Sequence, residues 1–283
     1  MLQNEQLSFE IPGGLSLRSE LSLRSLHLAR VNGLLHERTD GSIPSIVFGR
    51  EDNGRHGNFH PAAYGQICAR DSWAKRLEKV HTAYKRRRAR CDWEWKELDC
   101  SNSSDALLMN IFCYPGVLGR LKVQKLLNTG PNCEAEFGFK PRTPLNKGTS
   151  DNTEVDLRVG DTLFEAKLTE SDFQWSRWSQ IARYRDLEAV FDVPELPTRN
   201  EKIGGYQLVR GVLAAHYLGN SFCVLCDSRR PDLIESWYRV LRAVCPAELR
   251  CRLKLLTWQE LASALPSELQ EFLAMKYGIF ALA

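Results

Sequence analysis

The chain of 283 residues lacks any run of 18 apolar residues, so we expect no membrane-spanning helix. Its first residues contain no basic segment followed by an apolar stretch, and we therefore expect no secretory signal. The sequence has no P-loop, no dinucleotide-binding glycine pattern and no serine nucleophile elbow, which argues against those three chemistries. Its nine cysteines show no framework spacing, and their odd number favours a reducing, cytoplasmic setting.

The charge of the chain is close to balanced overall but is uneven along the sequence. The formal net charge of +3 is too small to indicate nucleic-acid binding by itself. Between Arg70 and Arg90, however, nine Lys and Arg residues face only two acidic ones. Apolar residues at helical spacing predict a helix from about Ser72 to Arg90, with these cations on its other face. Such a face can follow phosphates or can be an ordinary solvated surface. The candidate phosphate contacts are Lys75, Arg76, Lys79, Arg86 and Arg87.

The first 60 residues contain few structural signals. The segment Leu15–Glu20 is nearly repeated by Leu21–Leu26, which is compatible with a short amphipathic helix or with a disordered arm. Residues 41–62 are rich in Gly, Asn, His and Pro, and predict a loop with a brief strand at 43–48. We expect residues 1–60 to form a poorly ordered or loop-rich arm.

From Ser103 onward, alternating helix and strand signals predict an α/β (α+β) domain. The order is a helix, three strands, a helix and a strand, which indicates a mixed central sheet flanked by helices. The expected helices cover residues 103–114, 117–127, 171–191, 206–218, 232–244 and 259–277. The expected strands cover residues 133–139, 153–159, 162–168, 221–226 and 251–257.

The clearest local signal is a β-hairpin at residues 153–168. Two alternating runs flank the dipeptide Gly160-Asp161, a combination typical of a tight hairpin turn. Because alternate residues of a strand share a face, the polar side chains Asp156, Glu165 and Lys167 should come together, opposite the apolar ones. Two carboxylates and an amine suit a divalent metal ion and a water molecule beside a phosphodiester. The alternative is a solvent-facing strand pair with simple cross-strand ion pairs.

These residues resemble the PD-(D/E)xK nuclease superfamily, which has the restriction-endonuclease-like fold. The family pattern is an acid on one strand and Asp/Glu-x-Lys on the next, here Asp156 and Glu165-Ala166-Lys167. Val155 stands where the name of the motif has Pro. Downstream, Gln180-Ile181-Ala182-Arg183-Tyr184 fits the Gln-hydrophobic-x-x-Tyr motif of the RecB-like branch. The resemblance covers the chain from about Ser103 and implies an αβββαβ core.

The resemblance implies a metal-dependent nuclease that hydrolyses DNA in restriction, repair or recombination. Asp156, Glu165 and the Ala166 carbonyl would bind Mg²⁺, or Mn²⁺, and Lys167 would orient the attacking water or hold the phosphate. Gln180 and Tyr184 would contact the DNA strand or brace the lysine. A helical residue further on, Arg210, is a candidate phosphate contact. RNA is not excluded as a substrate, and a homodimer is a possible assembly.

On this interpretation, residues 61–98 form a basic helical extension packed on a nuclease-like domain at 99–283. Two other functions stay open. The chain could be a non-catalytic nucleic-acid-binding protein on the same fold, or a scaffold protein that offers its basic helix to an acidic partner. Asp105 or Glu136 could add a further acid to the site, although Asp105 also suits the first turn of a helix. Asn110 could face the same cleft.

Two groups of thiols and imidazoles remain. His56, His60 and Cys68 lie close together in the sequence but lack a clear fourth zinc ligand, for which Cys91 and Cys100 are candidates. Cys223-x-x-Cys226 lies on an expected strand, where residues three apart point to opposite faces. We therefore interpret this second group as two buried thiols rather than a chelating pair.

Overall fold

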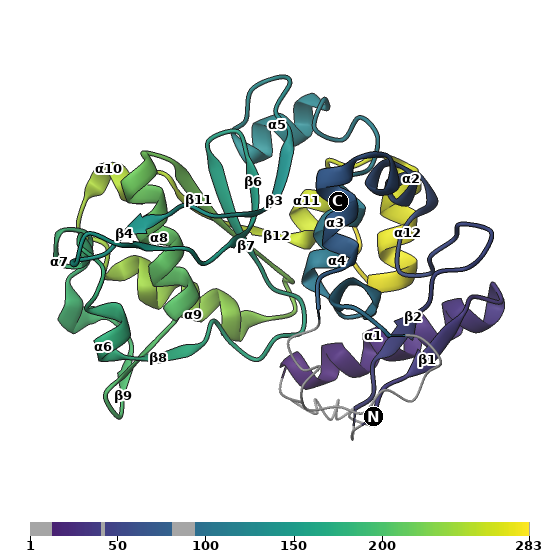
Figure 1. Cartoon of the computed structure of the whole chain (residues 1–283), viewed down its shortest axis with the longest axis horizontal. Coiled ribbons are helices and arrows are strands. Elements are labelled where there is room, and N and C mark those ends of the chain that lie inside the picture. The colour runs from purple at the N-terminus through teal and green to yellow at the C-terminus, as the bar shows by residue number, and fades with distance from the viewer. Residues whose placement is uncertain (1–12, 41–42, 81–93, 283) are drawn as a thin grey trace, which may run out of the picture.

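The computed structural model of the chain describes residues 13–40, 43–80 and 94–282. A mixed five-stranded sheet forms its centre, in the order β12-β11-β7-β6-β3. β3, β6 and β7 are antiparallel neighbours, whereas β7, β11 and β12 run parallel to one another. Figure 1 shows this sheet between two groups of helices. The strands are β3 (Ala135–Phe139), β6 (Val155–Val159), β7 (Thr162–Ala166), β11 (Ser221–Cys226) and β12 (Leu253–Thr257).

The hairpin predicted from the sequence is confirmed. Val159 pairs with Thr162, so Gly160 and Asp161 form a two-residue turn, and Gly160 has the positive φ of +55° that favours glycine. Burial alternates along β6, as expected for a strand with one apolar face. All five residues of β7 are buried, because β7 is central and helices cover both of its faces. The second strand of the hairpin is therefore less exposed than its alternation indicates.

Helices cover both faces of the sheet, as the order of elements predicts. On one side lie α8 (Tyr206–Leu218) and α9 (Pro231–Arg242), and on the other lie α4 (Ser104–Phe112), α11 (Trp258–Ala262) and α12 (Ser267–Tyr277) (Figure 1). The segment 259–277 thus forms parts of two helices, separated before Ser267 by Pro266. Two further helices are α5 (Leu121–Leu127) and α10 (Ala247–Arg250). In the described part of the chain, no helix combines the length and apolarity needed to cross a membrane.

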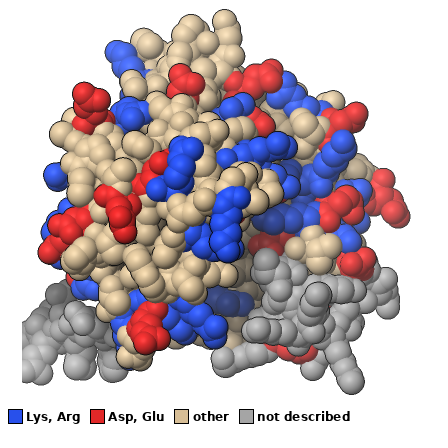
Figure 2. Space-filling view, turned by 60° about the vertical axis from the view of Figure 1, so that its left-hand side comes forward, with Lys and Arg blue, Asp and Glu red and all other residues tan. Residues whose placement is uncertain are grey.

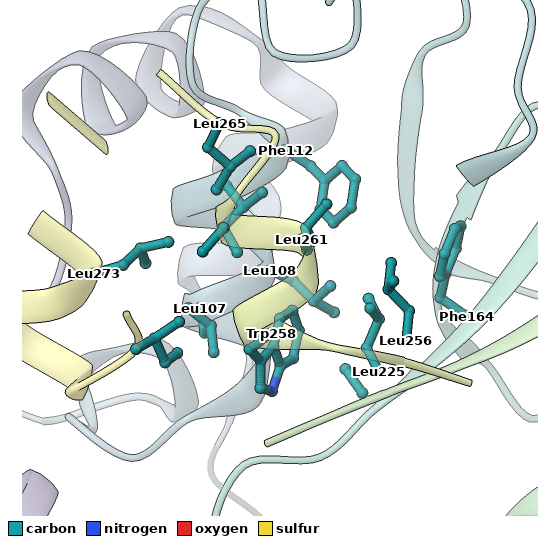
Figure 3. Close-up of a cluster of buried hydrophobic side chains, with 14 of the residues drawn as sticks. Leu107, Leu108, Phe112, Phe164, Leu225, Leu256, Trp258, Leu261, Leu265 and Leu273 are labelled. Carbon is teal, nitrogen blue, oxygen red and sulfur yellow. The ribbon is translucent and has the colours of Figure 1, made fainter. Parts of the chain in front are cut away.

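The core on the α4 side joins that helix to the three parallel strands. Figure 3 shows Leu108 and Phe112 of α4 near Phe164 of β7, with Leu225 of β11 and Leu256 of β12 in the same cluster. The two phenylalanine rings lie 6.1 Å apart between centroids. This packing fixes the first turn of α4 close to the end of the sheet where β7 and β11 finish.

The expectation of a poorly ordered arm is wrong for residues 13–31. These residues form α1 (Gly13–Val31), which packs against α12. Leu17, Leu21, Ser25 and Ala29 follow one another at intervals of four, so they share a helix face, and all four are buried. The expected brief strand is shorter, as β2 (Ile46–Phe48), and pairs with β1 (His36–Arg38). Docking to α12, rather than intrinsic helix signals, orders this segment.

The single basic helix expected over residues 72–90 is not what the structure shows. The structure has α2 (Pro61–Ala69) and α3 (Asp71–Leu77), and α3 ends after carrying only two cations of the stretch, Lys75 and Arg76. The turn η2 (Glu97–Asp99) packs next to α3, and the backbone N–H of Glu97 donates to the Lys79 carbonyl at 2.9 Å. Arg86 and Arg87 lie outside the described residues.

The single helix expected over 171–191 does not form. Its residues belong to β8 (Trp175–Arg177) and to the short helices α6 (Trp178–Ile181) and α7 (Leu187–Val190). Trp175 pairs with Gly204 of a later strand, and this tertiary pairing outweighs the helical spacing of the apolar residues. β8 belongs to a three-stranded sheet in the order β8-β10-β9. The other elements here are η3 (Val193–Glu195), β9 (Thr198–Arg199), β10 (Lys202–Gly204) and the hairpin of β4 (Thr143–Pro144) and β5 (Ser150–Asp151).

Candidate active site

The hairpin brings Asp156 and Glu165 to one end of the central sheet. Leu157 pairs with Phe164, and continuing this register by one residue sets Asp156 opposite Glu165, on the same face. The backbone N–H of Ala166 donates to Asp156 Oδ2 at 2.7 Å. The parallel strands β7 and β11 end here, which is the edge where ligand sites of such sheets commonly form.

Lys167 lies next to this pair and is bonded to one member of it. Its Nζ donates to Glu165 Oε1 at 2.6 Å, and the two residues are only 5% and 3% exposed. Trp258 holds the backbone from the other side, with its indole N–H 2.9 Å from the Lys167 carbonyl. Burial alone would lower the pKa of Lys167, but the carboxylates of Glu165, Glu170 and Asp156 outweigh it and raise that pKa. Lys167 is therefore a cation at neutral pH.

Asp156 is the site carboxylate with an unfavourable environment for its charge. Asp156 is half-buried, whereas Glu165 is buried. The pKa of Asp156 is raised well above its usual value, first by burial and then by the negative charges of Glu165 and Asp105, which the Lys167 ammonium only partly offsets. The site thus holds more negative charge than its own lysine neutralises.

Asp105 joins the site from the first turn of α4. The side chain of Ser103 accepts the capping hydrogen bond from the Ala106 N–H, so Asp105 is free of the capping function that its position suggests. Its Oδ2 instead accepts from Lys79 Nζ at 2.5 Å and from Arg76 Nη2 at 3.1 Å. Its charge contributes to the raised pKa of Asp156. A further acid near the pair was one of the alternatives left open by the sequence.

Two of the expected phosphate contacts therefore have internal partners. Arg76 bridges Asp105 and Glu154, with its Nη1 3.0 Å from Glu154 Oε2. Burial would lower the pKa of Lys79, but the Asp105 carboxylate outweighs it and raises that pKa. Both cations neutralise protein carboxylates beside the site. Lys75, by contrast, is exposed and forms no ion pair among the described residues.

A polar loop after Lys167 connects the site to α4. Glu170 accepts from the Ser104 hydroxyl at 2.6 Å and, with its other oxygen, from the Leu168 N–H at 2.6 Å. Next to it, Asn102 Nδ2 donates to the Thr169 hydroxyl at 3.1 Å. Glu170 also helps keep Lys167 charged. Sequence reasoning missed Glu170, which lies just before the helix that was expected over residues 171–191 and does not form.

Gln180 and Tyr184 do not lie together at the site. Gln180 is exposed on α6, whereas Tyr184 is buried beyond the end of that helix. The Tyr184 hydroxyl donates to Asp151 Oδ2 at 2.5 Å, and the pKa of Tyr184 is raised by burial and by this bond. The single helix expected to carry both residues is therefore wrong, whereas their expected contacts with the DNA strand stay a prediction. The Gln-hydrophobic-x-x-Tyr pattern is thus present in the sequence, but its residues do not lie on one helix as the motif requires.

Arg210 on α8 is occupied by protein contacts as well. Its Nε lies 3.4 Å from Asp151 Oδ2, and its Nη2 donates to the Glu154 carbonyl at 3.2 Å. These contacts hold the residues just before β6, the strand of Asp156. Arg210 therefore positions the strand of the site and is not a free phosphate contact.

The two other polar candidates lie elsewhere. Glu136 on β3 pairs with Arg158, 2.6 Å away across the strands. Asn110 is fully buried, where its amide accepts from the His60 N–H and donates to the Asn58 carbonyl. Neither residue forms a hydrogen bond or ion pair with Asp156 or Glu165 among the described contacts.

The imidazoles and thiols have separate surroundings. His56 Nε2 lies 2.9 Å from Asp99 Oδ1, whereas the ring of His60 accepts from the Ala62 N–H at the start of α2. Cys68 is exposed and free. Cys223 and Cys226 are both buried and belong to core clusters on opposite faces of the sheet, as the strand position predicts. Cys91 lies outside the described residues.

The donor set at the sheet edge fits a divalent cation. No group of three or more His, Cys, Asp or Glu side chains has a metal-binding arrangement in the part of the chain that the structure describes. Mg²⁺, however, needs only one or two carboxylates, because water and substrate oxygens complete its coordination. The pKa of Asp156 is raised by burial and then by the charges of Glu165 and Asp105, and a bound cation would favour the ionised carboxylate. Asp156, Glu165 and the Ala166 carbonyl are the oxygen donors available.

The sheet and this edge define the chain as a mixed α/β protein with a carboxylate–lysine site. Within that class it belongs to one family: residues 35–278 match the family described as Restriction Endonuclease associating with ARP. The membership makes it a protein of a restriction-endonuclease family. Comparison with curated proteins and with solved structures gives no match.

Proposed function

We propose that this protein is a metal-dependent nuclease that hydrolyses DNA phosphodiester bonds, and that its site is of the PD-(D/E)xK type on a restriction-endonuclease-like core. The observation that supports this most is the convergence of Asp156, Glu165 and Lys167 at the carboxyl ends of β7 and β11. Membership in a restriction-endonuclease family supports the same reaction class. DNA restriction is the process that fits best.

The side chains divide the chemistry between them. Mg²⁺ or Mn²⁺ held by Asp156, Glu165 and the Ala166 carbonyl would supply Lewis-acid stabilisation of the phosphate and lower the pKa of an attacking water. Lys167 serves as a cationic hydrogen-bond donor to a phosphate oxygen, because its raised pKa keeps the ammonium protonated. Glu165 keeps that ammonium in place through the 2.6 Å contact.

Access of a phosphate to the site depends on the side chains around it, among them Arg76 of α3 and Lys79 just after that helix. Lys167 is 5% exposed, so a phosphate reaches it only when neighbouring side chains move. Lys79 and Arg76 neutralise Asp105 next to Asp156, and a polyanion would compete for both cations. The family description names ARP as an associated component, and we propose that this chain acts together with that partner.

Cleavage assays test the proposal directly. Purified protein is incubated with plasmid, single-stranded DNA and RNA in Mg²⁺, Mn²⁺ or EDTA. We expect DNA cleavage only with a divalent ion, and a loss of about 100-fold or more in Asp156→Asn and in Lys167→Met. Asp161→Asn, an exposed turn position of the same hairpin, is the matched control and keeps wild-type activity.

Cleavage that persists in both Asp156→Asn and Lys167→Met would rule out this site. Binding of nucleic acid without cleavage in any metal would favour the non-catalytic binding protein. Failure to retain nucleic acid even at low salt would favour the scaffold protein, because phosphate contacts strengthen steeply as salt is lowered.

A further inference from the structure

Three cations lie side by side across the small sheet β8-β10-β9. Lys202 in the middle strand pairs directly with Arg177 of β8 on one side and with Arg199 of β9 on the other. Directly opposite residues of antiparallel strands project from the same face, so the three side chains form one cross-strand row. Strand spacing puts the outer two roughly 10 Å apart at the backbone. We call Arg177, Lys202 and Arg199 the basic row.

No carboxylate of the described residues forms an ion pair with the basic row. All three residues are exposed, and none of them forms an ion pair among the described residues. Like charges directly opposite each other on neighbouring strands are destabilising, so this arrangement has an energetic cost to the folded protein. Arg76 and Lys79, by comparison, are paired with Asp105 and Glu154. Among the described residues, the basic row therefore supplies unpaired positive charge that Arg76 and Lys79 do not.

An aromatic side chain lies next to the basic row on the same face. Trp175 is two residues before Arg177 in β8, so the two share a face, and its partner Gly204 lies two residues after Lys202. The Trp175 ring covers Gly204: a Cβ added there would come within 3.0 Å of it. The ring is nevertheless 45% exposed. Glycine at this position lets the indole lie along the sheet while one side stays open to solvent.

A hollow adjoins the basic row and contains a second exposed indole. The hollow has a volume of about 730 Å³ and is lined in part by Arg177, Lys202 and Trp178. Trp178 is 39% exposed, and its backbone N–H donates to the Glu201 carbonyl at 3.1 Å, which fixes α6 to the β9–β10 turn. In Figure 1, α6, β8 and β9 lie together at one end of the molecule, away from the central sheet.

We infer that this face of the β8-β10-β9 sheet binds a nucleic-acid strand, with phosphates on the basic row and a base stacked on Trp175. Closely spaced unpaired cations suit the dense negative charge of a phosphate backbone, and exposed indoles suit base stacking. Figure 2 shows Lys and Arg interspersed with Asp and Glu on one face of the molecule, so attraction by the overall charge is weak and local arrangement matters. The inference extends the proposed function by naming a binding surface, and it does not require cleavage.

Binding is measured in EDTA, so that the result is independent of catalysis. The probes are a fluorescent single-stranded DNA and the matching duplex, titrated at several salt concentrations. We expect Arg177→Gln/Arg199→Gln/Lys202→Gln to bind the single strand at least tenfold more weakly. The slope of log K against log salt should fall by about 2, from three lost phosphate contacts at about 0.7 each. Trp175→Leu should weaken single-strand binding by about tenfold and leave the salt slope unchanged.

The matched control is Lys122→Gln/Lys125→Gln/Arg250→Gln, which removes three exposed cations from α5 and α10. It should retain near wild-type affinity. Equal losses in the two triple variants, or no binding by the wild-type protein, would overturn the inference. So would competition by polyglutamate as strong as that by DNA, because it would indicate an acidic protein partner. Strong binding through the basic row without cleavage in any metal would contradict only the proposed function.

Discussion

The ammonium of Lys167 lies 2.6 Å from a carboxylate oxygen of Glu165, two residues earlier in the chain, and both side chains are almost inaccessible to water. Each charge therefore depends on the other for compensation. Removing one partner of a buried pair leaves an uncompensated charge, which costs more than the pair itself contributes. The pair can thus be studied through stability as well as through activity.

The first prediction concerns this pair. Lys167→Met should lower the free energy of unfolding by about 3 kcal/mol, since Glu165 remains buried without its ammonium. The double variant Glu165→Gln/Lys167→Met should lose clearly less than the sum of the two single variants. Urea denaturation at neutral pH measures all four proteins. Additive losses would show that the two side chains act independently.

The second prediction separates the cations at α3. Arg76→Gln should destabilise the protein by about 2 kcal/mol, because Asp105 and Glu154 lose a partly buried guanidinium. Lys75→Gln removes an exposed cation from the same helix and should change stability by less than about 0.5 kcal/mol. Thermal and urea denaturation give both values. Equal effects would mean that Arg76 is an ordinary surface residue.

The third prediction concerns Lys276 on α12, which is fully buried. Its Nζ lies 3.3 Å from the Gly57 carbonyl and 4.2 Å from the centre of the Phe48 ring. Burial lowers the pKa of Lys276 to about 7. Between this pH and the usual lysine pKa, the unfolded chain holds a proton that the native chain has lost, so stability should rise with pH. The limiting slope is about 1.4 kcal/mol per pH unit.

Lys276→Met is the variant that isolates this effect. It removes the titrating group and keeps most of the apolar stem, so the rise in stability with pH that Lys276 causes above pH 7 should be absent from the variant. Urea unfolding at a series of pH values gives the slope for each protein. Identical slopes in wild type and variant would show that Lys276 is not the titrating group.

The fourth prediction uses the same substitution in two helices. A Cβ at Gly211 of α8 would lie 2.2 Å from the Phe222 ring of β11, so Gly211→Ala should destabilise the protein by about 1–3 kcal/mol. Gly65 of α2 has no heavy atom within 4 Å of such a Cβ. Gly65→Ala should therefore stabilise by up to about 1 kcal/mol through helix propensity. Melting curves decide the signs, and equal signs would contradict the packing described for α8.

The hairpin and the main elements of the central sheet could be predicted because their signals are local. Alternation along residues 155–159 and the Gly160-Asp161 turn specify strand, turn and strand within a few residues. The opposite facing of Cys223 and Cys226 follows from strand geometry in the same way. Asp156, Glu165 and Lys167 therefore came together as expected, and their assignment as a catalytic site stays a prediction.

The remaining features depend on contacts between residues far apart in the chain. Residues 171–191 have helical spacing, but Trp175 pairs with Gly204 and the helix does not form. Residues 13–31 have weak local signals, and burial of Leu17 and Leu21 on α12 makes them a helix. Arg76 and Lys79 have the composition of a phosphate-binding surface, but Asp105 of α4 lies within reach of both.

The amino-acid sequence by itself determined the hairpin, the succession of the central-sheet strands along the chain, and the residue types at the sheet edge, because period-two and period-3.6 patterns act over short distances. Only the tertiary structure decided which charged side chains form ion pairs with other residues and which remain unpaired among the described residues. Coulombic interaction depends on distance in space and on burial, and neither is set by spacing along the chain. For that reason Arg76 and Lys79 are paired inside the protein, whereas Arg177, Arg199 and Lys202 are not paired with described carboxylates.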